Sequence, residues 1–275
     1  MDNMNLLFAI NSKFVKLLCN CLCSIAANGG ADHYHAYILH SDLTEEDQFV
    51  IRKNTDLRVE CRFVRVDEAI FEGFPESGRY PKQIYYRLAA PLALPKELDR
   101  VLYLDVDLVV INPLRELYET DFEGNYYAAC SHVKNFLTKC NQVRLGVTED
   151  VPYINTGVML MNLPLLRQNL TIERIRNVAR QRMHTFILPD QDLLTVMHGE
   201  HIKLLDTMIY NLSDRTLAAY NANPMNEMRD LDWVRKHSVI IHYFGKNKPW
   251  NDRYVGILDV FYLETIQQFQ KSQFV

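Results

Sequence analysis

The sequence predicts an α/β fold in which a mostly parallel, Rossmann-like central sheet carries helices on both faces. Strand and helix patterns alternate along residues 5–66, which is the order typical of such sheets. Polar side chains follow apolar strands at their carboxyl ends, where these sheets bind ligands. The chain has 275 residues, of which 48% are hydrophobic, and no linker interrupts it. We therefore expect a single domain over residues 1–275 with one large core.

The first half of the chain predicts alternating strands and helices. Short apolar runs bounded by turn residues mark strands, and apolar positions at helical spacing mark helices. In order, these are a strand at 5–10, a helix that Ser12 caps and Gly29-Gly30 ends, a strand at 34–40, a helix from Thr44, a strand at 60–66, a loop at 72–81, a helix at 82–90 and a strand at 101–104.

The second half continues the pattern with longer polar interruptions. Its expected elements are a second apolar run at 108–111, a short helix after Pro113, strands at 126–131 and 153–162, helices at 171–183 and 189–198, a strand at 201–205, a loosely helical stretch to about 236, a strand at 239–243 and a closing helix from about 253. The segment 132–150 is polar and irregular, which marks it as a candidate functional loop.

Composition excludes several classes of protein. The net charge is −4 and the 30 basic residues are dispersed, which argues against a nucleic-acid partner. The six cysteines lack the spacing of a disulfide framework and are expected to be thiols. The N-terminus has neither a basic region with a cleavage site nor a membrane span, so the expected location is the cytoplasm. Any anionic ligand must be met by a local site.

The stretch VLYLDVDLVVIN at 101–112 places two carboxylates between apolar runs. Asp105 and Asp107 are two residues apart, so they lie on one face of an extended chain at the end of a buried strand. Adjacent buried anions repel, and a divalent cation such as Mg²⁺ or Mn²⁺ would relieve the repulsion. Two other readings stay open: a chance Asp-x-Asp in a loop, and the nucleophile motif of haloacid-dehalogenase-type phosphatases, which Asp105 to Val109 also match.

A second strand delivers a polar side chain near residue 242. In VIIHYFGKNKPW, His242 follows apolar residues and precedes a loop with Gly245 and Lys248. A lone histidine at a strand end is most often an ordinary one. Here, however, Gly245 allows close backbone approach to an anion, and Lys248 supplies a charge suited to phosphate. If His242 joins the two carboxylates, its imidazole favours Mn²⁺ over Mg²⁺.

Two further polar groups interrupt apolar segments. Asn155-Thr156-Gly157 breaks a strand pattern, and Asp190-Gln191-Asp192 opens a helix after Pro189. Capping by Asp190 would explain one of these three side chains. Paired donors and acceptors, as on Asp190 and Gln191, also suit sugar hydroxyls.

Taken together, these motifs resemble glycosyltransferase family 8, the retaining enzymes of GT-A fold that include bacterial lipopolysaccharide galactosyl- and glucosyltransferases and glycogenin. The resemblance runs from about Leu6 to Trp250. It rests on Asp-x-Asp, Asn-x-Gly, Asp-Gln-Asp and His-x-x-Gly-x-x-Lys-Pro-Trp in this order, at residues 105–107, 155–157, 190–192 and 242–250. The phosphatase reading is weaker, because that class places its nucleophile near the N-terminus and needs a later lysine and acidic pair.

The resemblance implies a UDP-sugar donor and a metal ion, Mn²⁺ or Mg²⁺, held by Asp105, Asp107 and His242. It implies uracil contacts from Phe8, Ala9, Asn11 and Phe14, although Asn11-Ser12-Lys13-Phe14 departs from the family's usual acidic residue or asparagine followed by Asn-Tyr. It further implies that the donor's phosphates and sugar are bound by Arg87, Asp105, Val106, Asn155, Asp190, Gln191, Gly245 and Lys248. Gln191, Asp190 and Lys248 are the implied catalytic residues.

The same resemblance implies an activity and a division of the chain. Residues 1–112 would bind the nucleotide, residues 113–250 the sugar and acceptor, and residues 253–270 would form a C-terminal helix. The activity would be transfer of galactose or glucose to a saccharide or lipid-linked saccharide acceptor, in cell-surface or lipopolysaccharide-type glycan synthesis. The segments 132–150 and 207–232 are expected to shape the acceptor pocket.

Two alternative functions and one expectation about cellular location accompany this activity. The alternatives are a self-glycosylating primer protein like glycogenin and an inactive nucleotide-sugar-binding protein. Family members that act on lipid-linked sugars often carry a basic, aromatic C-terminal extension. A tail of that kind, missing here or trimmed after Val275, would place the protein at the inner face of the membrane.

Overall fold

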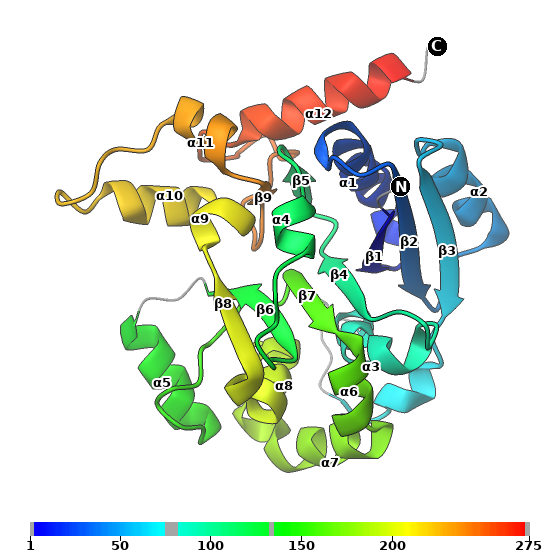
Figure 1. The fold of residues 1–275 in the computed structure, drawn as a ribbon, viewed down its shortest axis with the longest axis vertical. Helices are drawn as coiled ribbons and strands as arrows, with labels where there is room; N and C mark the ends of the chain where they lie inside the picture. The colour runs from blue at the N-terminus through cyan, green and yellow to red at the C-terminus, as the bar shows by residue number, and fades with distance from the viewer. Residues whose placement is uncertain (1–2, 75–81, 132–134, 273–275) are drawn as a thin grey trace.

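Seven strands form the central sheet of the computed structural model, which describes residues 3–74, 82–131 and 135–272. The sheet order is β3-β2-β1-β4-β7-β6-β8 (Figure 1). Pairs β1/β2, β2/β3, β1/β4 and β6/β8 are parallel, whereas β7 runs antiparallel to both β4 and β6. This confirms a mostly parallel sheet. The strands are β1 (Asn3–Ala9), β2 (His33–His40), β3 (Val59–Arg65), β4 (Arg100–Leu104), β6 (Tyr127–Cys130), β7 (Val158–Asn162) and β8 (Ile202–Leu205).

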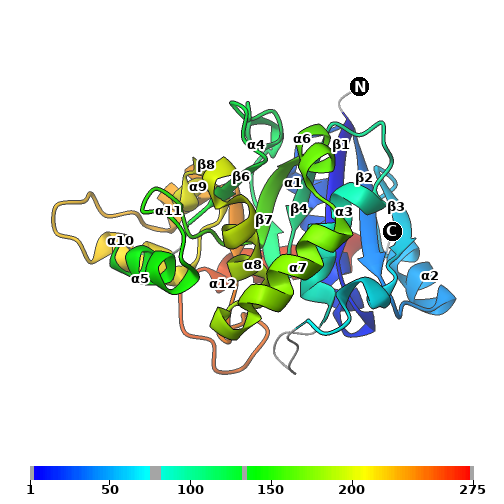
Figure 2. The same ribbon diagram turned by 90° about the horizontal axis from the view of Figure 1, so that it is seen from below.

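The strands are apolar on both faces because helices cover both faces. Along β1, Leu6 and Phe8 pack into one core while Leu7 packs into the other, as the two-residue strand period requires. The helices of the first core are α1 (Val15–Asn28), α2 (Glu45–Lys53) and α4 (Arg115–Tyr118). Those of the second core, seen in front of the sheet in Figure 2, are α3 (Tyr86–Ala93), α6 (Leu163–Asn169), α7 (Ile172–Arg182) and α8 (Pro189–His198), with the 3-10 turns η2 (Glu68–Phe71) and η3 (Lys82–Tyr85).

A small antiparallel sheet pairs two distant segments beside the central sheet. Strand β5 (Leu108–Val110) pairs with β9 (Ile240–His242), and Leu108 lies opposite His242. Val109 and Ile241 bury their side chains in a third apolar cluster. The helices around this sheet are α9 (Thr207–Tyr210), α10 (Asp214–Asn221), α11 (Leu231–His237) and α12 (Asp259–Ser272). The pairing therefore carries His242 to the chain that has just left Asp107.

The first helix begins differently from the prediction. Asn11, not Ser12, is the cap: its Oδ1 accepts the Lys13 N–H at 3.1 Å and starts the 3-10 turn η1 (Ser12–Phe14), which leads into α1. The Ser12 hydroxyl instead donates to Asp42 Oδ2 at 3.1 Å. The Ser12 hydroxyl, which was predicted to cap the helix, is therefore bonded to the Asp42 carboxylate instead.

The irregular character predicted for 132–150 is wrong for most of the segment, since α5 spans Asn135–Leu145. The pattern misleads because Leu137 and Val143 are 51% and 83% exposed while Gln142 is buried. The Gln142 amide donates to the Glu149 and Val151 carbonyl oxygens at 2.6 and 2.8 Å. A helix without an apolar stripe leaves no periodic signal. Residues 132–134, and residues 75–81 of the expected loop, lie outside the described residues.

Two other predicted boundaries also move. The strand predicted from 153 begins only at Val158, and the closing helix begins at Asp259 instead of 253. The turn before α12 is held by Asp214, whose Oδ1 accepts the N–H groups of Ile257 and Leu258 at 2.7 and 3.2 Å. These bonds hold the segment in a turn rather than a helix.

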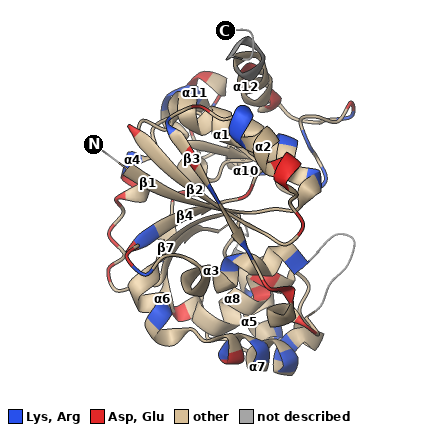
Figure 3. Ribbon diagram, turned by 90° about the vertical axis from the view of Figure 1, so that its right-hand side faces the viewer, with Lys and Arg blue, Asp and Glu red and all other residues tan. Residues whose placement is uncertain are grey.

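Charges are mixed over the surface rather than gathered. Figure 3 shows Lys and Arg interspersed with Asp and Glu, and α2 has acidic residues in its first turn and basic residues in its last. That distribution complements the helix dipole. Within the described residues, no helix combines the length and the apolar character needed to cross a membrane.

Candidate active site

Four chain segments meet beyond the carboxyl end of β4. The Asp105 N–H donates to the Gly157 carbonyl at 2.7 Å, which joins the end of β4 to the residue before β7. The Tyr243 N–H donates to the Asp107 carbonyl at 2.9 Å, which joins the end of β9 to the turn between β4 and β5. The N-terminus of α8 supplies Asp190 as the fourth contributor. The predicted functional side chains therefore lie on ends of regular elements that main-chain hydrogen bonds hold together.

Asp105, Asp107 and His242 each present one ligand atom to the others. These atoms lie within 4.8 Å of one another. His242 Nε2 is 3.1 Å from Asp107 Oδ1 and 3.8 Å from Asp105 Oδ2. The opposite carboxylate oxygens are occupied, because Asp105 Oδ1 accepts the Tyr103 hydroxyl at 2.7 Å and Asp107 Oδ2 contacts Lys248 Nζ. Three atoms of complementary chemistry are thus left facing a common point.

This donor set fits a divalent metal ion. Two carboxylate oxygens and one imidazole nitrogen suit Mn²⁺, and a set of oxygens alone would suit Mg²⁺. Across the described parts of the chain, no other trio of His, Cys, Asp or Glu side chains gathers this closely. The trio predicted from the sequence is therefore the candidate metal centre.

Gly157 leaves the space that this trio occupies. A Cβ atom on this residue would lie 2.3 Å from His242 Cε1 and 2.6 Å from Asp105 Oδ2. Real Cβ atoms do not approach neighbours this closely, so either the imidazole or the carboxylate would have to move. The absence of a side chain at 157 is a requirement of the candidate metal centre.

Arg87 joins the metal trio to Asp190. Its Nη2 lies 3.1 Å from Asp105 Oδ1 and its Nη1 lies 3.6 Å from Asp190 Oδ2. The Thr156 hydroxyl donates to the same Asp190 oxygen at 2.7 Å. Burial alone would lower the pKa of Arg87, but the carboxylates of Asp105 and Asp190 outweigh burial and raise it, whereas burial raises the pKa of Asp190. Arg87 therefore stays charged and offsets two carboxylates.

Lys248 offsets the charge of Asp107. Its Nζ contacts Asp107 Oδ2 and donates to the Tyr243 carbonyl at 2.7 Å. Burial alone would raise the pKa of Asp107, but His242 and Lys248 outweigh burial and lower it. Asp107 is therefore ionised and ready to bind a cation.

A cavity of about 440 Å³ adjoins this centre. Asn155 and Gln191 line it together with Phe244, so the cavity includes two of the predicted sugar contacts. Leu137 of α5 and three residues of α10 form another part of its wall; these are Arg215, Thr216 and Ala219. The two segments expected to shape an acceptor pocket, 132–150 and 207–232, thus both contribute to one cavity.

The predicted uracil contacts are only partly accessible. The Phe8 side chain is fully buried in the core around α1, so it reaches a ligand only through its backbone. Asn11 uses its side-chain oxygen as the helix cap, and Phe14 is 39% exposed. Ala9 and Val106 are half-buried. Base binding by Phe8, Ala9, Asn11 and Phe14, and binding of the donor's phosphates or sugar by Val106, stay predictions.

The alternative that Asp190 serves as a helix cap is wrong. Its carboxylate faces Thr156 and Arg87, as described above, while Asp192 bonds the N-terminus of α8. Asp192 Oδ2 accepts the Ile187 and Leu188 N–H groups at 2.6 and 3.0 Å. The carboxylate of Asp190 remains available for function.

Gly245, also predicted to contact the diphosphate, lies in the exposed turn before Lys248. Its φ is +86°, and a Cβ there would meet nothing within 4 Å. The residue is needed for the left-handed turn rather than for space.

Sequence reasoning missed Asn211, which is fully buried beside the metal trio. Its Oδ1 lies 2.8 Å from His242 Nδ1 and its Nδ2 donates to Asn155 Oδ1 at 3.2 Å. Asn211-Leu212-Ser213 matches a glycosylation acceptor, and a buried asparagine cannot serve as one. The only signal in the sequence was a polar residue between apolar neighbours, which is too common to indicate a site.

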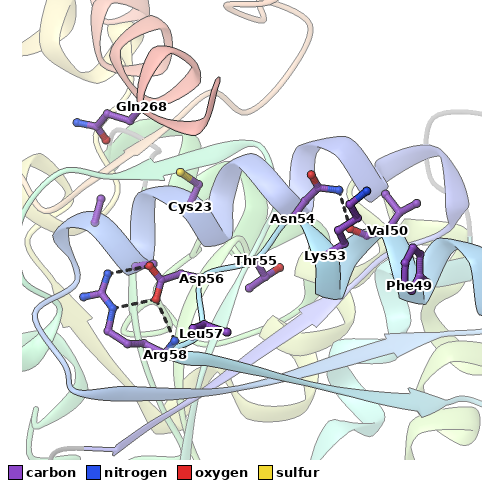
Figure 4. A pocket seen from close by; sticks show the side chains of 12 residues that line it. Cys23, Phe49, Val50, Lys53, Asn54, Thr55, Asp56, Leu57, Arg58 and Gln268 are labelled. Carbon is purple, nitrogen blue, oxygen red and sulfur yellow. Dashed lines mark hydrogen bonds and ion pairs between the residues drawn. The ribbon is translucent and has the colours of Figure 1, made fainter. Parts of the chain in front are cut away.

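A second, larger cavity of about 860 Å³ lies between α1, α2 and the end of α12 (Figure 4). Its wall includes Cys23, Phe49 and the ion pair of Arg58 with Asp56, in which Nε is 2.9 Å from Oδ1. None of the predicted site residues lines it. This cavity is therefore separate from the candidate active site at the ends of β4, β7 and β9 and the start of α8.

Comparisons with known sequences find a matching family model and related proteins. A family model described as glycosyl transferase family 8 matches residues 5–253. Lipopolysaccharide 1,2-glucosyltransferase of Escherichia coli is 27% identical over 234 residues, which cover 84% of this chain and 68% of the relative. Lipopolysaccharide 1,3-galactosyltransferase of Salmonella typhimurium is 26% identical over 200 residues, which cover 68% of this chain and 54% of the relative.

Solved structures share the fold. The galactosyltransferase LgtC in complex with donor and acceptor sugar analogues aligns with a TM-score of 0.80 at 22% identity, covering 96% of this chain and 95% of that one. At this identity the likeness establishes the fold alone. The fold is GT-A, as the sequence predicts.

Proposed function

The chain belongs to glycosyltransferase family 8, and from this premise we propose that it transfers a hexose, galactose or glucose, from a UDP-sugar to a saccharide acceptor with a divalent metal ion. The acceptor belongs to cell-surface or lipopolysaccharide-type glycans, the class on which the two named relatives act. The observation that carries the proposal is the convergence of Asp105 Oδ2, Asp107 Oδ1 and His242 Nε2. An inactive binding protein would have no need of this arrangement.

The donor's diphosphate belongs beside Lys248. When bound, Mn²⁺ supplies positive charge that stabilises the departing diphosphate. Lys248 lies at the same place with its Nζ on Asp107, and a phosphate oxygen offers it a second anionic partner. The turn at Gly245 brings backbone N–H groups near that anion. Lys248 and these N–H groups would stabilise negative charge on the departing diphosphate.

The sugar belongs between Asp190 and the cavity that Asn155 and Gln191 line. Asp190 is held by Thr156 and Arg87, so its carboxylate has a fixed direction for accepting sugar hydroxyls. Gln191 is half-buried in the cavity wall and offers a neutral amide. A neutral amide is a poor nucleophile, which favours a front-face displacement in which the leaving phosphate oxygen accepts the acceptor's proton. This geometry retains the anomeric configuration.

The acceptor belongs in the 440 Å³ cavity that α10 helps to line. Phe244 and Tyr153 provide apolar surfaces on which a sugar ring can pack, while Thr216 and Arg215 provide hydrogen-bond donors. Because this cavity touches both Asn155 and Gln191, an acceptor bound in it would present a hydroxyl to the donor sugar. Saccharides, including lipid-linked ones, have the mixed surface that this wall matches.

A donor screen tests the proposal. Slow hydrolysis of a panel of UDP-sugars is measured with Mn²⁺, with Mg²⁺ and with excess chelator. We expect turnover of UDP-galactose or UDP-glucose that requires the metal, and loss of about 10²-fold or more in rate for Asp107→Asn. Equal turnover in chelator contradicts the metal assignment, and no turnover of any UDP-sugar contradicts the transferase.

A further inference from the structure

We propose that Asn211 is a positioning residue for the metal site: it fixes the tautomer of His242 and the orientation of the Asn155 amide at the same time. The inference rests on the proposed metal site and adds to it a residue outside the ligand set. The carrying observation is a chain of hydrogen bonds that runs from the backbone of Gly157 to His242 Nδ1.

The direction of every bond in this chain follows from its first member. The Gly157 N–H is a backbone donor, and it lies 3.0 Å from Asn155 Oδ1. The atom of Asn155 at this position must therefore be the oxygen. Asn211 approaches the same oxygen at 3.2 Å, so it must do so with its NH₂ group.

The rest of the chain then determines the imidazole. With its NH₂ turned to Asn155, Asn211 directs its oxygen at His242 Nδ1, which lies 2.8 Å away. Only a donor satisfies that oxygen, so Nδ1 carries the hydrogen. The Nε2 lone pair then faces Asp105 and Asp107, which is the state in which a histidine binds a metal.

The backbone holds Asn211 in this place. The Leu212 N–H donates to the Ile240 carbonyl at 3.0 Å, and the His242 N–H donates to the Leu212 carbonyl at 2.7 Å. Asn211 is therefore next to Leu212, whose two main-chain hydrogen bonds attach it to β9, the strand that carries His242. The side chain is fully buried, so water does not compete for its two bonds.

The same chain determines what Asn155 offers the donor. Its Oδ1 already accepts from Gly157 and Asn211, so its NH₂ group is the part left for a ligand in the adjoining cavity. Asn155 therefore acts as a donor toward an oxygen of the sugar or phosphate. Asn211 links the metal ligand to this contact.

Nitrogen NMR of the metal-free protein tests the tautomer directly. Long-range proton–nitrogen spectra, recorded over a series of pH values so that the neutral imidazole is identified, distinguish Nδ1–H from Nε2–H. We expect His242 in the Nδ1–H form, which is the less common one in solution. An Nε2–H tautomer overturns the inference, and it does so without any variant having to fold and whether or not the protein is active.

Metal affinity tests the consequence. Mn²⁺ binding to Asn211→Leu, followed by the electron spin resonance of free Mn²⁺, should weaken about 10- to 100-fold relative to wild type, because the imidazole loses its outer partner. Asn211→Asp keeps an oxygen for Nδ1–H, so its Mn²⁺ affinity should stay within a few-fold of wild type. Its second oxygen faces Asn155 Oδ1, so the UDP-sugar KM should rise.

Asn162 provides the matched control. Its side chain also makes two hydrogen bonds, donating to the Asn125 carbonyl at 3.3 Å and accepting the Leu165 N–H at 3.3 Å, but it lies at the opposite end of β7 from Gly157. Asn162→Leu should lower thermal stability without changing Mn²⁺ affinity. If Asn211→Leu binds Mn²⁺ as tightly as wild type, the positioning role is wrong while the proposed function stands. If wild type itself binds no Mn²⁺, the proposed function fails first.

Discussion

Each member of the Asp105, Asp107 and His242 trio has an outer partner and turns another of its atoms toward the rest of the trio. Tyr103 and Arg87 take one oxygen of Asp105, and Lys248 takes one oxygen of Asp107. Outer partners fix the direction of a ligand and reduce the entropy that metal binding must overcome. Substitutions that crowd or free these side chains should therefore act on metal affinity before they act on the fold.

Gly157→Ala tests the space around the trio. The new Cβ would lie 2.3 Å from His242 Cε1, so the imidazole or the Asp105 carboxylate must shift. We expect Mn²⁺ affinity to fall by at least about 10-fold, as for other disruptions of ligand orientation. Calorimetric titration with Mn²⁺ measures the loss.

Gly199 is the control for the steric effect of an added methyl group away from the trio. A Cβ there would lie 2.3 Å from Val151 Cγ1, which is as tight as at Gly157 but beyond the far end of α8. Gly199→Ala should lower the free energy of unfolding by roughly 1 to 3 kcal/mol, the usual range for overpacking, and leave Mn²⁺ affinity alone. Weaker metal binding in Gly199→Ala alone would contradict the assignment of the trio.

Lys248→Met separates leaving-group stabilisation from metal binding. We expect kcat to fall by about 10²-fold, because a positioned charge on the departing diphosphate is lost. Mn²⁺ affinity without donor should not fall, because Asp107 loses a competing cation. The exposed Lys246 in the same turn is the control, and Lys246→Met should keep kcat near wild type. A fall in Mn²⁺ affinity with unchanged kcat in Lys248→Met would contradict this role.

At the residue scale, the candidate metal trio could be predicted because its side chains follow apolar strands. Asp105, Asp107 and His242 were predicted in this way, and in the structure their ligand atoms lie within 4.8 Å of one another. Asn211 was not legible. Its function depends on a contact with His242, 31 positions further along the chain, that only the tertiary fold creates.

At the scale of elements, one buried carboxylate anchors α8, which supports the site. Asp192 is fully buried and accepts hydrogen bonds from the Tyr153 hydroxyl at 2.7 Å and from Arg144 at 2.8 and 2.9 Å. Arg144 comes from α5, so a single carboxylate ties α5 and the chain before β7 to the start of α8. That start carries Asp190 and Gln191.

Asp192→Ala should therefore destabilise the protein strongly. Removing one partner of a buried ion pair leaves Arg144 uncompensated, which costs about 3 to 5 kcal/mol in the free energy of unfolding. Urea unfolding followed by circular dichroism measures the change. Asp150→Ala, on the exposed chain nearby, is the control and should stay within about 0.5 kcal/mol of wild type. A loss below about 1 kcal/mol for Asp192→Ala would show that the pair does not anchor α8.

Elements were predictable where burial is periodic. The strands and helices of the N-terminal half follow their apolar patterns, whereas α5 does not, since Leu137 and Val143 face outward. The small β5/β9 sheet was legible as two apolar runs but not as a pair. Pairing depends on which distant segments meet, and the sequence of one chain does not encode that locally.

At the scale of the whole molecule, one buried histidine links stability to pH. His198 is 3% exposed beside Tyr126 and Tyr127, and within the described residues neither ring nitrogen has a hydrogen-bond partner. Burial lowers its pKa from 6.5 to about 4. Between about pH 6.5 and pH 4, this histidine is protonated in the unfolded chain but stays neutral in the folded chain. The free energy of unfolding therefore decreases as the pH falls from about 6.5 to about 4.

His198→Leu should flatten this dependence. A shift of about 2.5 pKa units corresponds to roughly 3 kcal/mol at most, so wild type should lose up to that amount relative to the variant between pH 7 and pH 4. Urea unfolding at stepped pH gives the difference. His33→Leu, at an exposed position, is the control and should follow the wild-type slope. Parallel curves for wild type and His198→Leu would show that His198 is not buried in its neutral form.

The fold as a whole was accessible from the sequence because its large core leaves a strong pattern and because the motifs recur in order along one domain. The identity of the donor sugar and of the acceptor could not be predicted from the sequence. The choice between galactose and glucose leaves no motif in the sequence, because these sugars differ only in the orientation of one hydroxyl.

A crystal soaked with manganese and uridine diphosphate, recorded at the manganese absorption edge, tests the central claim most directly. We expect one anomalous peak within coordination distance of Asp105 Oδ2, Asp107 Oδ1 and His242 Nε2, with the diphosphate beside it. Diphosphate bound with no peak between these three atoms, or a peak held by other residues, would contradict it.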